Sequence, residues 1–247
     1  DFIYLQLASS YLMEIAESIL YYPLGDSAVV IGLGQAISER IHNHIIAIGD
    51  FLEEYSFDGF IEYVPAFTTV TVFYDPLIAD YKTVEIHLKE MLDEVSEEKN
   101  SIPAITVDIP VLYGGVQGPD LTFVAKNAGI SEAEIIDVHT EKEYLVYMIG
   151  FAPGFPYLGG MNEKIASPRK EVPSTNIPAG SVGIAGIQTG IYPIETPGGW
   201  QIIGQTPLKL FDVNRNPPAL IKAGNKLRFV AITEDEFDEM KAEYDGD

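Results

Sequence analysis

The chain has 247 residues, of which 47% are hydrophobic and 21% are charged, a composition typical of a globular protein and too apolar for a disordered one. The 37 acidic and 15 basic residues give a net charge of -22, which argues against nucleic acid or an anionic membrane as a partner. Because the chain has no cysteine, disulfides, thiolate metal ligands and a cysteine nucleophile are excluded. The length is sufficient for two domains.

The sequence shows neither a membrane-spanning segment nor a signal-peptide pattern. No apolar run approaches the roughly 20 residues that a membrane helix needs, and residues 1–7 lack the pattern of a signal peptide. We therefore expect a cytoplasmic protein without a membrane segment. Met13 is a candidate natural start, which would make residues 1–12 a tail or an extension. Residues 234–247 carry eight carboxylates and one lysine, so we expect an acidic, solvated tail or terminal helix there.

The first part of the chain, residues 13–103, predicts a small α/β domain. Its elements, in chain order, are a strand at 27–33, an amphipathic helix at 36–55, a hairpin of strands at 60–64 and 69–74, and a helix from Asp80 to Val95, and a strand at 106–111 follows them. Strand, helix, hairpin, helix, strand is the ferredoxin-like order. The last strand could instead open the second domain, since the boundary is expected near residues 101–103.

The second part, residues 104–233, predicts a β-sandwich or closed β-barrel. Two short helices are expected at 119–127 and 131–137, and Ser131 followed by Glu134 fits a capping box. The strands expected after them lie at 144–149, 201–203, 209–211 and 226–231. Many short strands separated by Gly and Pro turns are typical of such folds.

The most informative segment runs from Gly150 to Pro207. It contains half of the 22 glycines, half of the 16 prolines and the single tryptophan, Trp200. Glycine allows positive φ and close backbone approach, whereas proline fixes φ and removes a donor. The segment is therefore expected to form rigid loops between short strands, which is how a shaped surface is built.

Several familiar catalytic devices are missing from the sequence. The pair Gly32 and Gly34 follows a strand, but Ile37 stands where a dinucleotide fingerprint needs its third glycine, so a tight turn is the better interpretation. There is no P-loop, and Ser181 lacks the surroundings of a nucleophile elbow. The four histidines form no zinc pattern, so no metal site is expected.

Three residues of the second part have both a structural and a functional interpretation. Arg169 could hold a carboxylate through two hydrogen bonds, or it could pair with Glu171 on the surface, and the two are equally weighted. Trp200 could be a ligand wall or a core plug, with the plug slightly favoured. His139 is expected to make a core or loop hydrogen bond, with lining of a site as the alternative.

At these residues the sequence resembles the allophanate hydrolase subunit 1, or KipI-like, family. The resemblance rests on Gly-Phe-Ala-Pro-Gly-Phe-Pro-Tyr-Leu at 150–158, Pro-Arg at 168–169, Pro-Ala-Gly-Ser-Val-Gly-Ile-Ala-Gly at 178–186, Gln-Thr-Gly-Ile-Tyr-Pro at 188–193 and Pro-Gly-Gly-Trp at 197–200. Tyr-Pro-Leu-Gly-Asp-Ser-Ala at 22–28 adds to it, and the likeness extends over residues 19–229.

The resemblance implies an α+β protein, with an N-terminal ferredoxin-like α/β domain followed by a cyclophilin-like β-barrel. Family members work beside a homologous, KipA-like second subunit, and the pair resembles the carboxyltransferase part of urea carboxylase. In the 5-oxoprolinase setting a lactam-utilisation subunit joins them, and the complex uses ATP to open pyroglutamate to glutamate. The chain has no Ser-Ser-Lys amidase system and no biotin-attachment Met-Lys-Met, so such chemistry would belong to another chain.

On this basis we expect a non-autonomous subunit of an ATP-dependent 5-oxoprolinase. Arg169 would hold a carboxylate or phosphate, with Gln188, Tyr192 and Gln205 orienting the substrate, and backbone N–H groups near Gly154 and Gly180 would stabilise negative charge. The further expected substrate-binding residues are Phe155, Tyr157, Ser181, Gly183, Trp200 and His139. Two alternatives stay open: an inhibitor of a sporulation histidine kinase, and a carboxyltransferase half-subunit of a biotin-dependent urea carboxylase.

Overall fold

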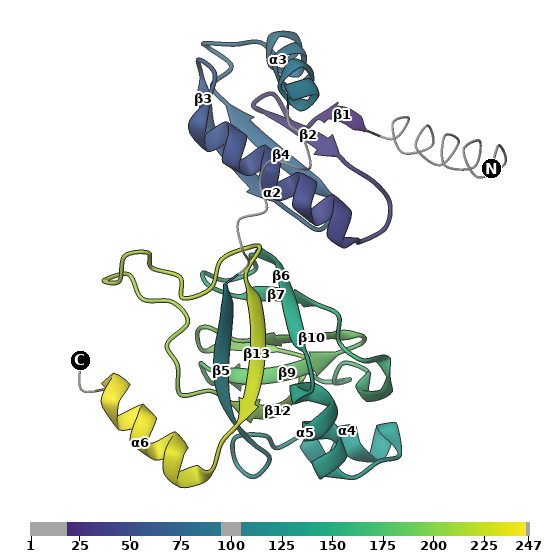
Figure 1. Ribbon diagram of the computed structural model, residues 1–247, viewed down its shortest axis with the longest axis vertical. Helices are drawn as coiled ribbons and strands as arrows, with labels where there is room; N and C mark the ends of the chain where they lie inside the picture. Colours follow the sequence, from purple (N-terminus) through teal and green to yellow (C-terminus); the bar gives the residue numbers. More distant parts are fainter. Residues whose placement is uncertain (1–18, 95–104, 246–247) are drawn as a thin grey trace, which may run out of the picture. The chain divides into compact units, whose positions relative to one another are not determined.

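The computed structural model describes residues 19–94 and 105–245 (Figure 1). The chain divides into two compact units, residues 1–102 and residues 103–247. The domain boundary expected near residues 101–103 and the tail expected at residues 1–12 lie outside the described residues. No helix of the described ranges is both long and apolar enough to cross a membrane.

Within residues 19–94, the first unit is a four-stranded antiparallel sheet with two helices. The strand order is β1-β2-β4-β3. Its elements are β1 (Leu20–Pro23), β2 (Ala28–Gly32), α2 (Glu39–Glu54), β3 (Phe60–Pro65), β4 (Thr69–Tyr74) and α3 (Tyr81–Glu94). The expected helices and the expected hairpin are thus confirmed, with ends that differ by a few residues.

Local sequence signals explain where the two helices begin. The Ser38 hydroxyl accepts a hydrogen bond from the Ile41 N–H at 3.2 Å, and the Asp80 carboxylate accepts one from the Thr83 N–H at 2.8 Å. Apolar residues of both helices pack with those of β2 and β4 in one core. That core contains Val29, Ile31, Ile45, Ile48, Leu52, Val70, Val72, Val84, Leu88 and Met91.

The expected ferredoxin-like order of this unit is not confirmed. Residues 106–111 lie in the sheet of the second unit, and β1 supplies the fourth strand of the first. The turn at residues 24–27, with Gly25 at φ +67°, folds β1 back onto β2 as an edge strand. Leu20 and Tyr22 are about half exposed, so this short strand lacks the clear burial pattern that sequence reasoning detects.

The second unit is built on a seven-stranded sheet in the order β10-β9-β12-β5-β13-β6-β7 (Figure 1). The two ends of this order, β7 and β10, also contact each other, so the sheet forms a nearly closed barrel. All its pairs are antiparallel except β5 with β13, which is parallel. Its strands are β5 (Thr106–Tyr113), β6 (Glu143–Ile149), β7 (Pro156–Gly159), β9 (Ser181–Ala185), β10 (Gln188–Ile191), β12 (Gln201–Gln205) and β13 (Lys226–Ala231).

The barrel unit also has short accessory elements. They are α4 (Leu121–Ala128), α5 (Glu132–Thr140), the 3₁₀ helix η1 (Glu163–Ile165), the two-stranded sheet of β8 (Ser174–Ile177) with β11 (Thr196–Gly198), and α6 (Glu234–Asp245). The predicted capping box is confirmed, because the Ser131 hydroxyl accepts from the Glu134 N–H and the Glu134 carboxylate accepts from the Ser131 N–H. The expected acidic tail forms helix α6, and Phe237 of that helix is buried.

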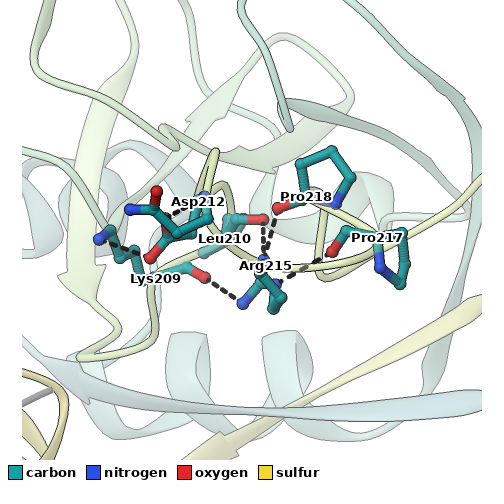
Figure 2. A network of polar contacts seen from close by, with 7 residues as sticks. Lys209, Leu210, Asp212, Arg215, Pro217 and Pro218 are labelled. Carbon is teal, nitrogen blue, oxygen red and sulfur yellow. Dashed lines mark hydrogen bonds and ion pairs between the residues drawn. The ribbon is translucent and has the colours of Figure 1, made fainter.

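The expected strand at residues 209–211 is wrong. This segment belongs to an irregular loop between β12 and β13 whose carbonyl groups are used by Arg215 (Figure 2). The Arg215 guanidinium donates to the carbonyl oxygens of Lys209 at 3.0 Å, Leu210 at 2.9 Å and Pro218 at 2.9 Å. The Leu210 and Pro218 carbonyls also accept from the Leu220 and Asp212 N–H groups, and residues 209–211 form only an isolated bridge between Phe211 and Ala219.

Candidate functional site

The Gly- and Pro-rich segment covers the outside of the barrel with a second apolar cluster. Successive side chains of a strand point to opposite faces of the sheet. Accordingly Ile184 of β9 belongs to the barrel core, whereas its neighbour Ala185 belongs to the second cluster. The second cluster, which we call the aromatic cluster, consists of Phe155, Ile177, Ala185, Tyr192, Trp200 and Ile202, with Ala152 and Tyr157 packed against it.

Phe155 lies at the centre of the aromatic cluster. Its ring makes edge-to-face contacts with Tyr157, Tyr192 and Trp200, at centroid distances of 5.2, 5.7 and 5.7 Å. Such contacts favour one arrangement of the rings over others. Trp200 is 7% exposed and Tyr192 is 2% exposed, so the indole ring is a plug on the outer face of the barrel.

Two glycines explain how large rings can lie so close to the strands. A Cβ atom on Gly190 would lie 3.1 Å from atoms of both Phe155 and Trp200, and one on Gly183 would lie 3.2 Å from the Trp200 Cβ. An alanine at either position would therefore force Phe155 or Trp200 to shift by a few tenths of an ångström. Gly183 thus acts through packing here, although it was expected to contact substrate.

Hydrogen bonds hold the chain on both sides of Arg169. The Gln201 side chain donates to the Pro168 carbonyl at 2.9 Å, and the Lys170 N–H donates to the Gly199 carbonyl at 2.7 Å. The Arg169 side chain itself is exposed. Across residues 19–94 and 105–245 no hydrogen bond or ion pair engages its guanidinium, so the pairing with Glu171 is not formed. The arginine therefore presents a charge to solvent from a fixed backbone.

Tyr192 places a hydroxyl in reach of that charge. Burial raises the pKa of the Tyr192 phenol, while the positive charge of Arg169 and a hydrogen bond from the backbone of Trp200 act in the opposite direction. The phenol stays neutral at physiological pH. The exposed Arg169 guanidinium therefore acts electrostatically on the buried Tyr192 phenol of the aromatic cluster.

The loop before β7 presents an exposed aromatic side chain. Phe151 has φ +65°, a conformation that a bulky residue rarely adopts, and its ring is 67% exposed. The Ala152 N–H donates to the Gly150 carbonyl at 2.7 Å, which makes a γ-turn centred on Phe151. Gly154, at φ +84°, packs against Phe211 of the loop that Arg215 organises. The loop thus packs on Phe211, and the Phe151 ring is largely exposed while it contacts the Phe155 ring edge-to-face at 5.4 Å.

Several expected site residues are engaged within the fold. The Gly180 N–H donates to the Tyr192 carbonyl at 2.7 Å and the Ser181 N–H to the Pro178 carbonyl at 3.3 Å, so neither amide is left to stabilise a developing charge. The Gln205 side chain donates to the Ala179 carbonyl at 2.7 Å and thereby fastens the same loop. Gln188 opens β10 and is half-buried.

His139 lies on the other side of the sheet from the aromatic cluster, in the barrel core. It is wholly buried in the last turn of α5 and stacks on Phe229 at 4.3 Å. The Thr189 hydroxyl donates to the Gly183 carbonyl and accepts from His139 Nε2–H at 2.8 Å, which leaves Nδ1 to accept from the Tyr113 hydroxyl at 2.7 Å. Burial lowers the pKa of His139 to about 3.

The structure therefore brings together Arg169, Tyr192, Trp200, Phe155 and Tyr157, and separates His139 from them. Sequence reasoning missed Phe151 and the pair of Asp120 with Lys170, whose side chains meet at 2.6 Å beside Arg169. The signal for Phe151 was a bulky residue inside a run of turn formers. Among the described residues, no group of three or more His, Asp or Glu side chains could hold a metal ion.

Comparison with known proteins agrees with this architecture. The chain matches the family model of the carboxyltransferase domain, subdomain C and D, over residues 19–221. The solved structure of the urea carboxylase of Kluyveromyces lactis superposes with a TM-score of 0.75 at 19% identity, over 92% of this chain and 23% of that one, which shows a shared fold. This chain belongs to the carboxyltransferase C and D domain family.

Within that family the similarity is more specific. The chain is 50% identical over 230 residues to the B-type subunit of 5-oxoprolinase from Bacillus subtilis strain 168, which covers 89% of this chain and 95% of the relative. It is 38% identical over 211 residues to the protein of the same name from Escherichia coli O157:H7, covering 85% and 94%. The two relatives match along nearly their whole length.

Proposed function

We propose that this chain is the B-type subunit of an ATP-dependent 5-oxoprolinase, a hydrolase complex that opens 5-oxoproline to glutamate. The observation that carries the proposal is the 50% identity to a protein of that name over 95% of its length. The urea carboxylase likeness, at 19% identity and 23% of that chain, supports the fold and not the reaction. A carboxyltransferase role is therefore the weaker alternative.

In this proposal the complex contains a homologous second subunit and a lactam-utilisation subunit. The unstrained lactam needs activation at its carbonyl before water can attack, and ATP would supply that activation within the complex. This chain would contribute binding and orientation of the substrate, which lowers the barrier by holding reacting groups in place. It would act in the cytoplasm and be inactive alone.

The residues that we assign to the substrate are Arg169 and Tyr192. 5-Oxoproline carries a carboxylate beside its ring, and a guanidinium without an ion-pair partner among the described residues is suited to hold it. The neutral Tyr192 phenol lies near the same charge and can take part in orienting the ligand. Gln188, half-buried at the start of β10, is a further candidate for orientation.

The neighbouring surface is suited to a partner subunit. Phe151 is 67% exposed although it is held in a strained conformation, and Ile194, which follows the Pro193 that packs on Gly154, is 41% exposed. A strained, solvent-facing aromatic residue costs stability in the free chain. Burial against another subunit would offset that cost, so we place the completing part of the site on a second chain.

The test is reconstitution of the complex from purified subunits. We expect ATP hydrolysis that depends on 5-oxoproline, with glutamate as product, only when this chain is present. Arg169→Gln should raise the KM for 5-oxoproline by about tenfold or more, since a charge-assisted pair is lost. The matched control is Arg228→Gln. It removes an exposed arginine of β13 that pairs with Asp108 of β5 at 2.8 Å. Suppression of a histidine kinase by the chain, with no turnover by the complete complex, would favour the kinase-inhibitor alternative.

A further inference from the structure

Asp120 stands at the N-cap of helix α4 but does not cap it. An aspartate in this position usually accepts a hydrogen bond from the first turn of its own helix, a contact that stabilises by about 1 kcal/mol. Here no such bond is formed. The Asp120 carboxylate instead accepts from the Lys170 ammonium at 2.6 Å and from the Ile202 N–H at 2.7 Å. Asp120 therefore binds residues distant in sequence in place of the first turn of its own helix.

The pair of Asp120 with Lys170 is also the more enclosed kind of ion pair. The two side chains are 18% and 21% exposed, whereas those of Lys226 and Glu143, at 3.4 Å on the barrel surface, are 43% and 40% exposed. Exposed pairs contribute little to stability or to geometry. A largely buried pair costs desolvation, and its best-attested benefit is to fix one arrangement of the chain.

What this pair fixes is the segment that carries Arg169. The ammonium of Lys170 also lies 3.3 Å from the Ser174 hydroxyl, and the backbone N–H of Lys170 donates to the Gly199 carbonyl. Through Asp120 the same ammonium is tied to Ile202, and the Asp120 N–H in turn donates to the Ile202 carbonyl at 2.8 Å. Residues 168–170 are therefore tied to residues 199–202 by both backbone and charge.

The same strand segment controls the partner of Arg169. Trp200 lies between Gly199 and Gln201, the two residues that bind on either side of Arg169, and both its backbone and the Arg169 charge oppose the rise in the pKa of the Tyr192 phenol. Displacement of residues 199–202 would thus change the separation of the guanidinium and the phenol. A displacement of about 1 Å is enough to weaken binding that depends on orientation.

We propose that Asp120 and Lys170 are positioning residues for Arg169. Their ion pair holds the backbone that carries Arg169 against residues 199–202, without itself touching the ligand. This inference rests on the proposed function, in which Arg169 binds the carboxylate of 5-oxoproline. It predicts that the ion pair sets the affinity for that substrate and leaves the affinity for ATP unchanged.

The kinetic test uses the reconstituted complex and three single variants of this chain. Lys170→Met and Asp120→Asn should each raise the KM for 5-oxoproline by about tenfold, with kcat and the KM for ATP changed less than about twofold. The control Lys226→Met, which breaks the exposed pair with Glu143, should leave all three constants unchanged. Equal losses in kcat for the variants and the control would overturn the proposal.

A coupling measurement separates positioning from general damage. If Lys170 acts through Arg169, the double variant Arg169→Gln with Lys170→Met should have the same KM as Arg169→Gln alone. If the KM of the double variant instead rose by the product of the two single fold-changes, Lys170 would act independently of Arg169, and the inference would fail. The conservative variant Lys170→Arg keeps a cation at this position. It should therefore have a KM for 5-oxoproline close to that of the wild type.

A second readout needs no activity, so it keeps the inference separate from the proposed function. Trp200 is the single tryptophan and lies in the segment that the ion pair holds. In the isolated chain, Lys170→Met and Asp120→Asn should shift its emission to the red and raise quenching by acrylamide, while Lys226→Met should not. A wild-type complex without 5-oxoproline-dependent turnover would refute the proposed function, whereas unchanged Trp200 emission in the variants would refute the positioning role.

Discussion

The buried histidine of the barrel makes a defined prediction about acid sensitivity. His139 is held neutral in the fold, with a pKa of about 3 against an ordinary value of 6.5. Because the folded pKa is lowered, the stabilisation from the neutral ring is fully present above about pH 6.5 and is lost as the pH falls toward 3. Between pH 7.5 and pH 5.0 this single group should remove about 2 kcal/mol from the free energy of unfolding.

The variant His139→Gln isolates this contribution. Glutamine has a donor and an acceptor, as the neutral histidine does, but it loses the ring that stacks on Phe229 and packs in the core, so at pH 7.5 we expect a loss of about 2 to 3 kcal/mol. Since glutamine does not titrate, the difference from the wild type should shrink by about 2 kcal/mol at pH 5.0.

The assay is urea unfolding at both pH values, followed by the emission of Trp200, which lies in the same unit as His139. His44→Gln, in the first unit, is the control and should leave the Trp200 transition unchanged. A difference between His139→Gln and wild type that stays constant between the two pH values, within about 0.5 kcal/mol, would refute the neutral buried state.

Three further substitutions test the account of the site and its loops. Gly190→Ala should destabilise the barrel unit by about 1 to 3 kcal/mol and shift Trp200 emission, because the new methyl group meets Phe155 and Trp200 at 3.1 Å; unchanged emission would contradict it. Phe151→Gly relieves φ +65° but loses the edge-to-face contact with Phe155, so it should change the stability of the isolated chain by less than about 1 kcal/mol while weakening association with the partner subunit in a pull-down titration. Arg215→Lys should lower the melting temperature and increase proteolysis within residues 209–218, since an ammonium cannot bond the same carbonyls; equal resistance to protease would count against it.

Much of the fold could be predicted from the sequence because its local signals agree with its packing. The capping box at Ser131 and the N-cap at Asp80 form as predicted, and the apolar stripe of α2 faces the sheet. One strand assignment was open and another was wrong, both for identifiable reasons. Residues 106–111 belong to the second unit, which was the alternative to the ferredoxin-like order, and periodicity could not decide between the two because it does not tell which sheet a strand enters. Residues 209–211 have a strand-like composition, but the loop folds around the Arg215 guanidinium and only one isolated bridge forms.

The candidate site was predictable in outline and less so in its details. Composition located the segment, and the family motifs within it include Arg169, Tyr192 and Trp200. Sequence alone could not tell which glycines serve packing, since that depends on the rings lying against Gly183 and Gly190. It also gave no sign of the bond between Asp120 and Lys170, because the aspartate stands where a local cap would explain it.

The central claim is that this chain is a required subunit of a complex that hydrolyses 5-oxoproline with ATP. The most direct measurement is glutamate formation from 5-oxoproline and ATP by the purified partner subunits, with wild-type chain, with the Arg169→Gln variant, and without the chain. We expect turnover with the wild type, a raised KM for 5-oxoproline with the variant, and none without the chain. Equal glutamate formation in the presence and absence of this chain would contradict the claim.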